Sequence, residues 1–346
     1  MKMKLVSNGR NSIQEKSVHQ YIEPIWLGLR IYRGFILNLL GTKVPFFVGH
    51  KLTYNCNLRC KMCPFWKRTS ADSSLEQEKA ILKHIYNSGA CGIAFEGGEP
   101  LLRRDLVDIL AFSRSLPLHT SLITNGMLLE SRIDEITPYI NGVIYVSLDG
   151  LEKTHDNIRG VRGSFRKALA GIGAAQRKCP VTINTTVTAE NVDEIESLVQ
   201  LANELGTKIS IAIAHEYCNA SSSSPAIDKT LKIAHRLLEL KRNGYPIANS
   251  IGYLKVMAKI KDWHCKPWTM INIDAQGNVV LPCYVRNDYS STVHISEGGI
   301  EAAISSFAWK NVDTCKKCNL HCYVEPSLAL SRDISAYMYW AFHVSF

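Results

Sequence analysis

The chain has 346 residues, of which 46% are hydrophobic and 21% charged, and this composition excludes a disordered, a collagen-like or a small disulfide-stapled protein. Lysine and arginine exceed aspartate and glutamate by 40 to 31, which gives a net charge of +9, but residues 1–51 alone hold eight basic and two acidic side chains. The rest of the chain is nearly neutral, so no nucleic-acid partner is expected.

The N-terminal segment, residues 1–47, is basic and aromatic. Apolar residues recur there near one helical face, at Ile25, Leu29, Tyr32, Ile36 and Leu40. The stretch 21–41 is short for a membrane span and is interrupted by Arg30 and Arg33. It predicts a helix that either packs on the protein's own body or makes peripheral contact with a membrane surface. Because Met1–Arg10 lacks a secretory signal pattern, we expect a cytoplasmic protein.

From residue 46 to about 215 the chain alternates short apolar runs with amphipathic stretches, and we expect residues 48–250 to form one core domain. The runs predict six strands, at Phe46–Leu52, Gly92–Phe95, His119–Ile123, Gly142–Leu148, Val181–Val187 and Lys208–Ile213. Helices are predicted between them, near 74–88, 104–115, 129–138, 164–177 and 191–205. This alternation is typical of a parallel α/β sheet or barrel, although a closed barrel has eight strands.

The rest of the chain changes character. A helix is predicted near 226–243, and Ile271–Leu281 predicts a hairpin. We expect residues 251–325 to form a small second module and residues 326–346 to form a C-terminal tail.

Three cysteines follow the first apolar run directly. Cys56, Cys60 and Cys63 form a Cys-x₃-Cys-x₂-Cys loop whose thiolates can converge on one metal cluster. A cubane iron–sulfur cluster normally takes four thiolates, so three local ligands leave one iron open for a reactant. A zinc site completed from elsewhere and unrelated free thiols are the other interpretations.

This loop resembles the hallmark of the radical S-adenosylmethionine (SAM) superfamily, and Glu96–Pro100 resembles the family's Gly-Gly-Glu-Pro motif. The resemblance covers residues 48–215 and implies a partial (β/α)₆ TIM-like barrel, in agreement with the six apolar runs. It implies that the three cysteines bind a [4Fe–4S] cluster and that SAM chelates the fourth iron. One electron then cleaves SAM to a 5′-deoxyadenosyl radical, which abstracts hydrogen from the substrate. Met62 stands where the family often has an aromatic residue.

Glycines and polar residues at the predicted strand ends resemble the family's SAM-binding segments. The resemblance implies SAM binding by Gly97, Gly98, Glu99, Pro100, Thr124, Asn125, Ser147, Asp149, Arg159 and Asn184. Glycine lets a backbone approach a ligand closely, but Asn-Gly and Asp-Gly are also ordinary turn formers. A solvated Arg159 and an Asn184 that pairs within the barrel are the alternatives for those two residues.

A second group of cysteines lies near the C-terminus, at Cys265, Cys283, Cys315, Cys318 and Cys322. A Cys-x₂-Cys pair is a common zinc motif. After a radical SAM core, the group resembles the SPASM and twitch extensions, which bind auxiliary [4Fe–4S] clusters. Five cysteines are too few for the two clusters of a full SPASM domain, so we expect one cluster, held by Cys265, Cys283, Cys315 and either Cys318 or Cys322. Cys91, Cys179 and Cys218 have no assigned role.

We therefore expect a radical SAM enzyme with one catalytic and one auxiliary cluster, reduced by a ferredoxin or flavodoxin. Its substrate is either a peptide or protein side chain or a lipid or isoprenoid. The alternative is an iron–sulfur or zinc protein that binds a partner and catalyses nothing.

Overall fold

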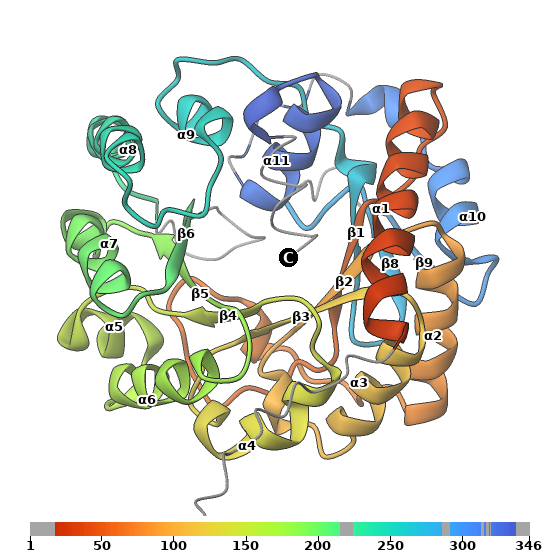
Figure 1. Ribbon diagram of the computed structural model, residues 1–346, viewed down its shortest axis with the longest axis horizontal. Coiled ribbons are helices and arrows are strands. Elements are labelled where there is room, and N and C mark those ends of the chain that lie inside the picture. The colour runs from red at the N-terminus through yellow and green to blue at the C-terminus, as the bar shows by residue number, and fades with distance from the viewer. Residues whose placement is uncertain are drawn as a thin grey trace, which may run out of the picture.

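The computed structural model describes residues 18–214, 224–285, 291–312, 315, 318 and 320–336. In this part of the chain, nine strands form one sheet in the order β6-β5-β4-β3-β2-β1-β7-β8-β9. Figure 1 shows the strands β1 to β6 as a curved arc with helices around its outer side. The ends of the expected N-terminal segment and C-terminal tail, residues 1–17 and 337–346, lie outside the described residues.

All six predicted strands are confirmed. They are β1 (Phe47–Lys51), β2 (Gly92–Glu96), β3 (His119–Thr124), β4 (Ile144–Ser147), β5 (Val181–Val187) and β6 (Lys208–Ile213). Each pairs in parallel with its neighbour along the chain, and the sheet is not closed. The fold is therefore the expected α/β partial barrel, whose strand carboxyl ends share one edge.

Helices cover the outer side of the arc. Those predicted are α2 (Leu75–Asn87), α3 (Leu106–Ser115), α4 (Leu129–Ile136), α6 (Ser164–Gln176), α7 (Ile195–Glu204) and α8 (Ile227–Arg242). α2 begins at a capping box, in which Ser74 accepts from the Gln77 amide and the Gln77 side chain accepts from the Ser74 amide. The sequence reading did not predict α5 (Glu152–Arg159), which is short and polar and ends at Gly160 in the left-handed conformation.

The C-terminal part extends the same sheet. It contains α9 (Ile251–Met257), β7 (Met270–Ile273), β8 (Asn278–Leu281), β9 (Ser291–His294), α10 (Gly299–Ser306) and α11 (His321–Leu330). The predicted hairpin is confirmed, because β7 and β8 pair antiparallel and Asp274 Oδ1 accepts from the amides of Gln276 and Asn278 at the turn. β7 also pairs in parallel with β1. Region 251–325 thus continues the sheet of the barrel.

The N-terminal helix α1 (Val18–Leu39) packs against the outside of this body (Figure 1). Its residues Leu27, Ile31 and Phe35 pack against a small buried cluster of Phe46, Cys91 and Leu330. Packing on the protein's own body, one of the two alternatives for this helix, is therefore observed, but through a different face from the predicted apolar one. Within the described ranges, every helix is too short or too polar to cross a bilayer.

Candidate active site and metal centres

The first cysteine group lies in the loop that leaves the carboxyl end of β1. Cys60 is buried and Cys56 and Cys63 are half-buried. The pKa of Cys56 is raised to about 11, mainly by burial and to a smaller extent by the nearby thiols of Cys60 and Cys63. The structure therefore brings the three thiols together, and a metal must displace their protons to bind.

The Gly-Gly-Glu-Pro segment packs directly against this loop. A Cβ on Gly97 would lie 2.4 Å from Thr53 O, and a Cβ on Gly98 would lie 2.2 Å from Asn55 O. The Gly98 amide donates to Thr53 O at 2.7 Å, and the Glu99 amide donates to Asn55 O at 2.8 Å. The close backbone approach that requires glycine is thus an approach to the cysteine loop, and it fixes that loop against the end of β2.

Glu99 joins three segments of the predicted SAM site. Its buried carboxylate accepts from Thr124 Oγ1 at 2.7 Å and from the Asn125 amide at 2.7 Å. Asn125 Nδ2 in turn donates to Asn57 Oδ1 in the cysteine loop at 2.7 Å. Burial raises the pKa of Glu99, and the hydrogen bonds that it accepts oppose this shift. Pro100 begins a short 3₁₀ helix, Pro100–Leu102, capped by the same carboxylate. Sequence reasoning missed Asn57.

Asp149 and Arg159 form a buried ion pair beside Cys60. Arg159 Nη2 lies 2.5 Å from Asp149 Oδ2, and Arg159 Nη1 donates to Cys60 Sγ at 3.7 Å. Burial raises the pKa of Cys60, and the Arg159 guanidinium opposes this shift. α5 sets this geometry, since the amides of Arg59 and Lys61 in the cysteine loop donate to the Arg159 and Ile158 carbonyls at its end. Arg159 is therefore not a solvated surface arginine.

Ser147 ends β4, and its partner in the strand register is Asn184 in the middle of β5. Val146, the residue before Ser147, contacts the position where a Cβ on Gly126 would lie, near Ala168 of α6. Because neighbouring side chains of a strand point to opposite faces, Ser147 points away from the helices toward the barrel interior.

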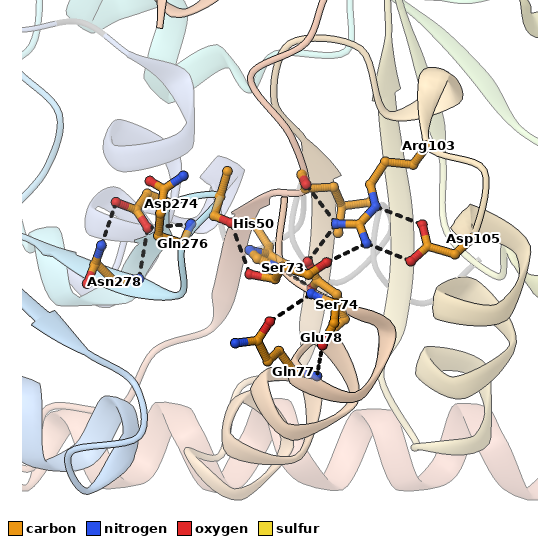
Figure 2. A network of polar contacts seen from close by, with 12 residues as sticks. His50, Ser73, Ser74, Gln77, Glu78, Arg103, Asp105, Asp274, Gln276 and Asn278 are labelled. Carbon is orange, nitrogen blue, oxygen red and sulfur yellow. Dashed lines mark hydrogen bonds and ion pairs between the residues drawn. The ribbon is translucent and has the colours of Figure 1, made fainter. Parts of the chain in front are cut away.

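A buried network around Arg103 holds both ends of the cysteine loop (Figure 2). Arg103 donates to Leu52 O at 2.9 Å, where the loop begins, and to Ser73 O at 2.8 Å, where it ends. Arg103 also pairs with Asp105 and, at 2.9 Å, with Glu78 of α2. Sequence reasoning missed this network, because its members have no motif in common.

The Glu78 carboxylate is fully buried, and each of its two oxygens contacts a different side chain. His50 Nε2 lies 2.6 Å from Glu78 Oε2, while Arg103 binds the other oxygen. His50 belongs to β1, so the network also fastens this strand to α2 (Figure 2).

The second cysteine group surrounds one small cavity. Its lining includes four thiols, those of Cys265, Cys283, Cys315 and Cys318, and is otherwise mostly apolar. The pKa of Cys318 is raised to about 12, mainly by burial and to a smaller extent by the thiols of Cys283 and Cys315. Cys322 is not part of this lining, although it is half-buried near Cys318. In the described part of the chain, which includes both cysteine groups, no three Cys, His, Asp or Glu side chains converge as ligands of a single metal ion would.

A buried ion pair and two aromatic rings lie between the two cysteine groups. Lys51 Nζ is 2.6 Å from Glu96 Oε1, and it is 4.4 Å and 4.6 Å from the ring centroids of Phe65 and Tyr284. Phe65 and Tyr284 contact each other edge to face, and Tyr284 directly follows Cys283. These residues were not predicted. Of the cysteines without an assigned role, Cys91 is buried near α1 and Cys218 lies outside the described residues.

Comparisons with known proteins show the family and the fold. The model of the Radical SAM superfamily matches residues 51–202, and a domain of unknown function, DUF3463, matches residues 208–340. The PqqA peptide cyclase of Gluconobacter oxydans is 30% identical over 262 residues, which cover 69% of this chain and 70% of that protein. The chain belongs to the radical SAM superfamily.

Other relatives match a smaller share of their length. The AdoMet-dependent heme synthase of Methanosarcina barkeri is 36% identical over 172 residues, 48% of this chain and 49% of that protein. The chain thus spans about half the length of several of its relatives. Among solved structures, Streptococcus suis SuiB bound to S-adenosylmethionine has a TM-score of 0.67 at 17% identity and covers 94% of this chain and 82% of that one. At this identity the likeness shows the fold.

The relatives named here are a heme synthase and a peptide cyclase, and membership of the same superfamily favours the expected enzyme over the alternative of a non-catalytic binding protein. The superfamily uses a [4Fe–4S] cluster and SAM, and the residues present fit this pair. Three thiols share one loop, and hydrogen bonds fasten this loop to the ends of β2, β3 and α5. Four further thiols around one apolar cavity suit a second cubane, which takes one thiolate per iron.

Proposed function

We propose that this enzyme binds a [4Fe–4S] cluster through Cys56, Cys60 and Cys63 and uses it to cleave SAM reductively, so that a 5′-deoxyadenosyl radical abstracts hydrogen from a substrate C–H bond. The observation that supports this most directly is the packing of the three-thiol loop against the Gly97–Pro100 segment, with Gly98 and Glu99 bonded to its backbone. A ferredoxin or flavodoxin supplies the electron.

The chain's own side chains divide into two roles in this proposal. Glu99, Asp149 and Arg159 are buried and bonded to protein groups, so they position the cysteine loop and the strand ends around SAM. Ser147 and Asn184 contact SAM directly, because they are partners in the register of β4 and β5 and Ser147, the last residue of β4, points to the barrel interior. Thr124 and Asn125 support the same pocket through Glu99.

The test is anaerobic reconstitution of the full chain, reduction with dithionite and measurement of 5′-deoxyadenosine from added SAM. We expect product from the wild type and none above background from Cys60→Ala. Equal amounts from both proteins would refute the proposal. Ser147→Ala is expected to raise the SAM concentration needed for half-maximal cleavage without changing the iron content.

We propose that Cys265, Cys283, Cys315 and Cys318 hold one auxiliary [4Fe–4S] cluster and that Cys322 is the spare cysteine. The shared cavity of the four thiols supports this choice. Iron and sulfide analysis should give about eight irons for the wild type and about four for Cys283→Ala, since each cubane contains four. Cys322→Ala is the matched control and should keep about eight. Zinc in place of iron at this site, or loss of iron from Cys322→Ala, would contradict the assignment.

We propose a peptide or protein side chain as the substrate. Relatives with 26–30% identity support this class, namely the PqqA peptide cyclase and the Bacillus subtilis sporulation killing factor maturation protein SkfB. The second candidate is a membrane lipid or isoprenoid, with peripheral contact through residues 21–41. A specific observation favours it: three residues of the predicted apolar face, Leu29, Tyr32 and Leu40, are exposed. Assays of SAM cleavage stimulated by peptide libraries or by lipid extracts distinguish the two classes.

A further inference from the structure

The helix α1 and the residue that follows it, Leu40, carry large apolar side chains that the rest of the described chain leaves exposed. Trp26 is 57% exposed, Leu29 53%, Tyr32 64%, Leu39 49% and Leu40 76%. These five are half of the ten large hydrophobic side chains exposed in the described part of the chain. We call them the α1 stripe. Such a concentration in one segment differs from the scattered exposed apolar residues that are normal on a protein surface.

The α1 stripe has no part in holding the helix in place. At about 100° per residue, Trp26, Leu29 and Tyr32 point away from the face of Leu27, Ile31 and Phe35 that packs on the body. Leu39 and Leu40 stand at the C-terminal end of the helix. Polar bonds fix the inner side as well. Arg30 Nη2 donates to the carbonyls of Tyr86 and Ala90, both at 2.7 Å, and Trp268 Nε1 donates to Asn38 Oδ1 at 2.8 Å. The helix is thus anchored with the stripe turned outward.

The charges around the stripe are cationic. From Trp26 to Lys43 the chain has three basic residues and no aspartate or glutamate. Arg30 is bonded on the inner side and Lys43 Nζ lies 5.2 Å from the Trp268 ring centroid, whereas Arg33 is exposed on the stripe side, next to Tyr32. A stripe of Trp, Leu and Tyr beside an exposed arginine and without carboxylates is typical of helices that lie in the plane of a membrane interface, where aromatic rings occupy the headgroup level and cations contact anionic lipids.

We propose that the α1 stripe docks this enzyme on an anionic lipid membrane, with the helix parallel to the bilayer plane and the body on the aqueous side. The inference deepens the second substrate candidate above and rests on it only in placing the enzyme at a membrane. The absence of carboxylates along the stripe favours an anionic lipid surface over a second copy of the chain, which would present the same cationic helix to itself.

The experiment is flotation of the reconstituted full chain with phosphatidylcholine vesicles, with and without phosphatidylglycerol. The stripe variant combines Trp26→Ser, Leu29→Ser and Tyr32→Ser. The matched control combines Ile227→Ser, Ile260→Ser and Ile334→Ser, which are exposed apolar residues elsewhere. We expect the wild type and the control to float with phosphatidylglycerol vesicles and to dissociate at high salt. The stripe variant should bind roughly ten-fold or more weakly, because three apolar side chains no longer enter the interface.

Three results would overturn the inference: no flotation of the wild type with either vesicle, equal flotation of the stripe variant, or a wild-type dimer in light scattering that the stripe substitutions dissociate. Circular dichroism of the variants shows that they are folded, as expected for changes to exposed residues. SAM cleavage is measured in parallel. Retained cleavage without vesicle binding refutes only the docking, and vesicle binding without cleavage refutes only the proposed chemistry.

Discussion

Replacing Arg103 with methionine tests whether the buried network fixes the cysteine loop. Methionine keeps much of the apolar stem and removes the guanidinium that binds Leu52 O, Ser73 O, Glu78 and Asp105. Glu78 is fully buried, and only His50 would then remain on its carboxylate. Breaking a buried ion pair by removing one partner costs about 3–5 kcal/mol. Since whole domains are stable by about 5–15 kcal/mol, this change is large.

The effect should appear first at the metal. The two carbonyls that lose Arg103 stand at the two ends of the loop with Cys56, Cys60 and Cys63, so the loop is released before the sheet unfolds. We expect Arg103→Met to lower the urea midpoint and to lose about half of its iron on reconstitution, with the auxiliary cluster retained. Urea unfolding followed by circular dichroism and iron analysis measure the two effects.

Two further variants make this prediction specific. Arg166→Met in α6 breaks an exposed ion pair with Glu152 of α5. It should change neither the urea midpoint nor the iron content, because exposed ion pairs contribute little to stability. Adding Glu78→Gln to Arg103→Met should recover part of the lost stability, because burying a neutral amide costs less free energy than burying an unpaired carboxylate. Arg103→Met with a wild-type midpoint and full iron loading would refute the reasoning.

Other residues give independent predictions. Gly98→Ala places a Cβ 2.2 Å from Asn55 O, so the cysteine loop must shift, and we expect iron loading of the first cluster to fall while Gly173→Ala, which meets no atom within 4 Å, behaves as wild type. Asp149→Ala leaves Arg159 buried without its carboxylate and should lower the thermal midpoint and the SAM affinity measured by calorimetry; a wild-type affinity would contradict the positioning role. Burial raises the pKa of Glu325 to about 7, so the folded protein holds a proton that the unfolded chain releases. Stability should therefore fall by about 3 kcal/mol as the pH rises from about 4.5 to 7, and Glu325→Gln should flatten this part of the urea midpoint profile.

The sequence predicted the six parallel strands because apolar runs such as Gly92–Phe95 are buried on both faces and carry a strong local signal. It did not predict α5, in which only His155 and Ile158 are buried, so that no apolar period marks the helix. The site followed the same rule. Cys56, Cys60 and Cys63 share a local motif, whereas the contact of Arg159 with Cys60 depends on a segment 99 residues away.

The pairing of β1 with β7 was also beyond local patterns, because it joins residues more than 200 positions apart. It has a practical consequence for handling the protein. A fragment that stopped near residue 250 would leave β1 with a bare, unpaired side in what is normally the middle of the sheet, and such exposed strand edges invite aggregation. The barrel half should accordingly be insoluble when expressed alone. During synthesis, β1, the strand that precedes the first cysteine loop, can complete its pairing only after the C-terminal third of the chain has been translated.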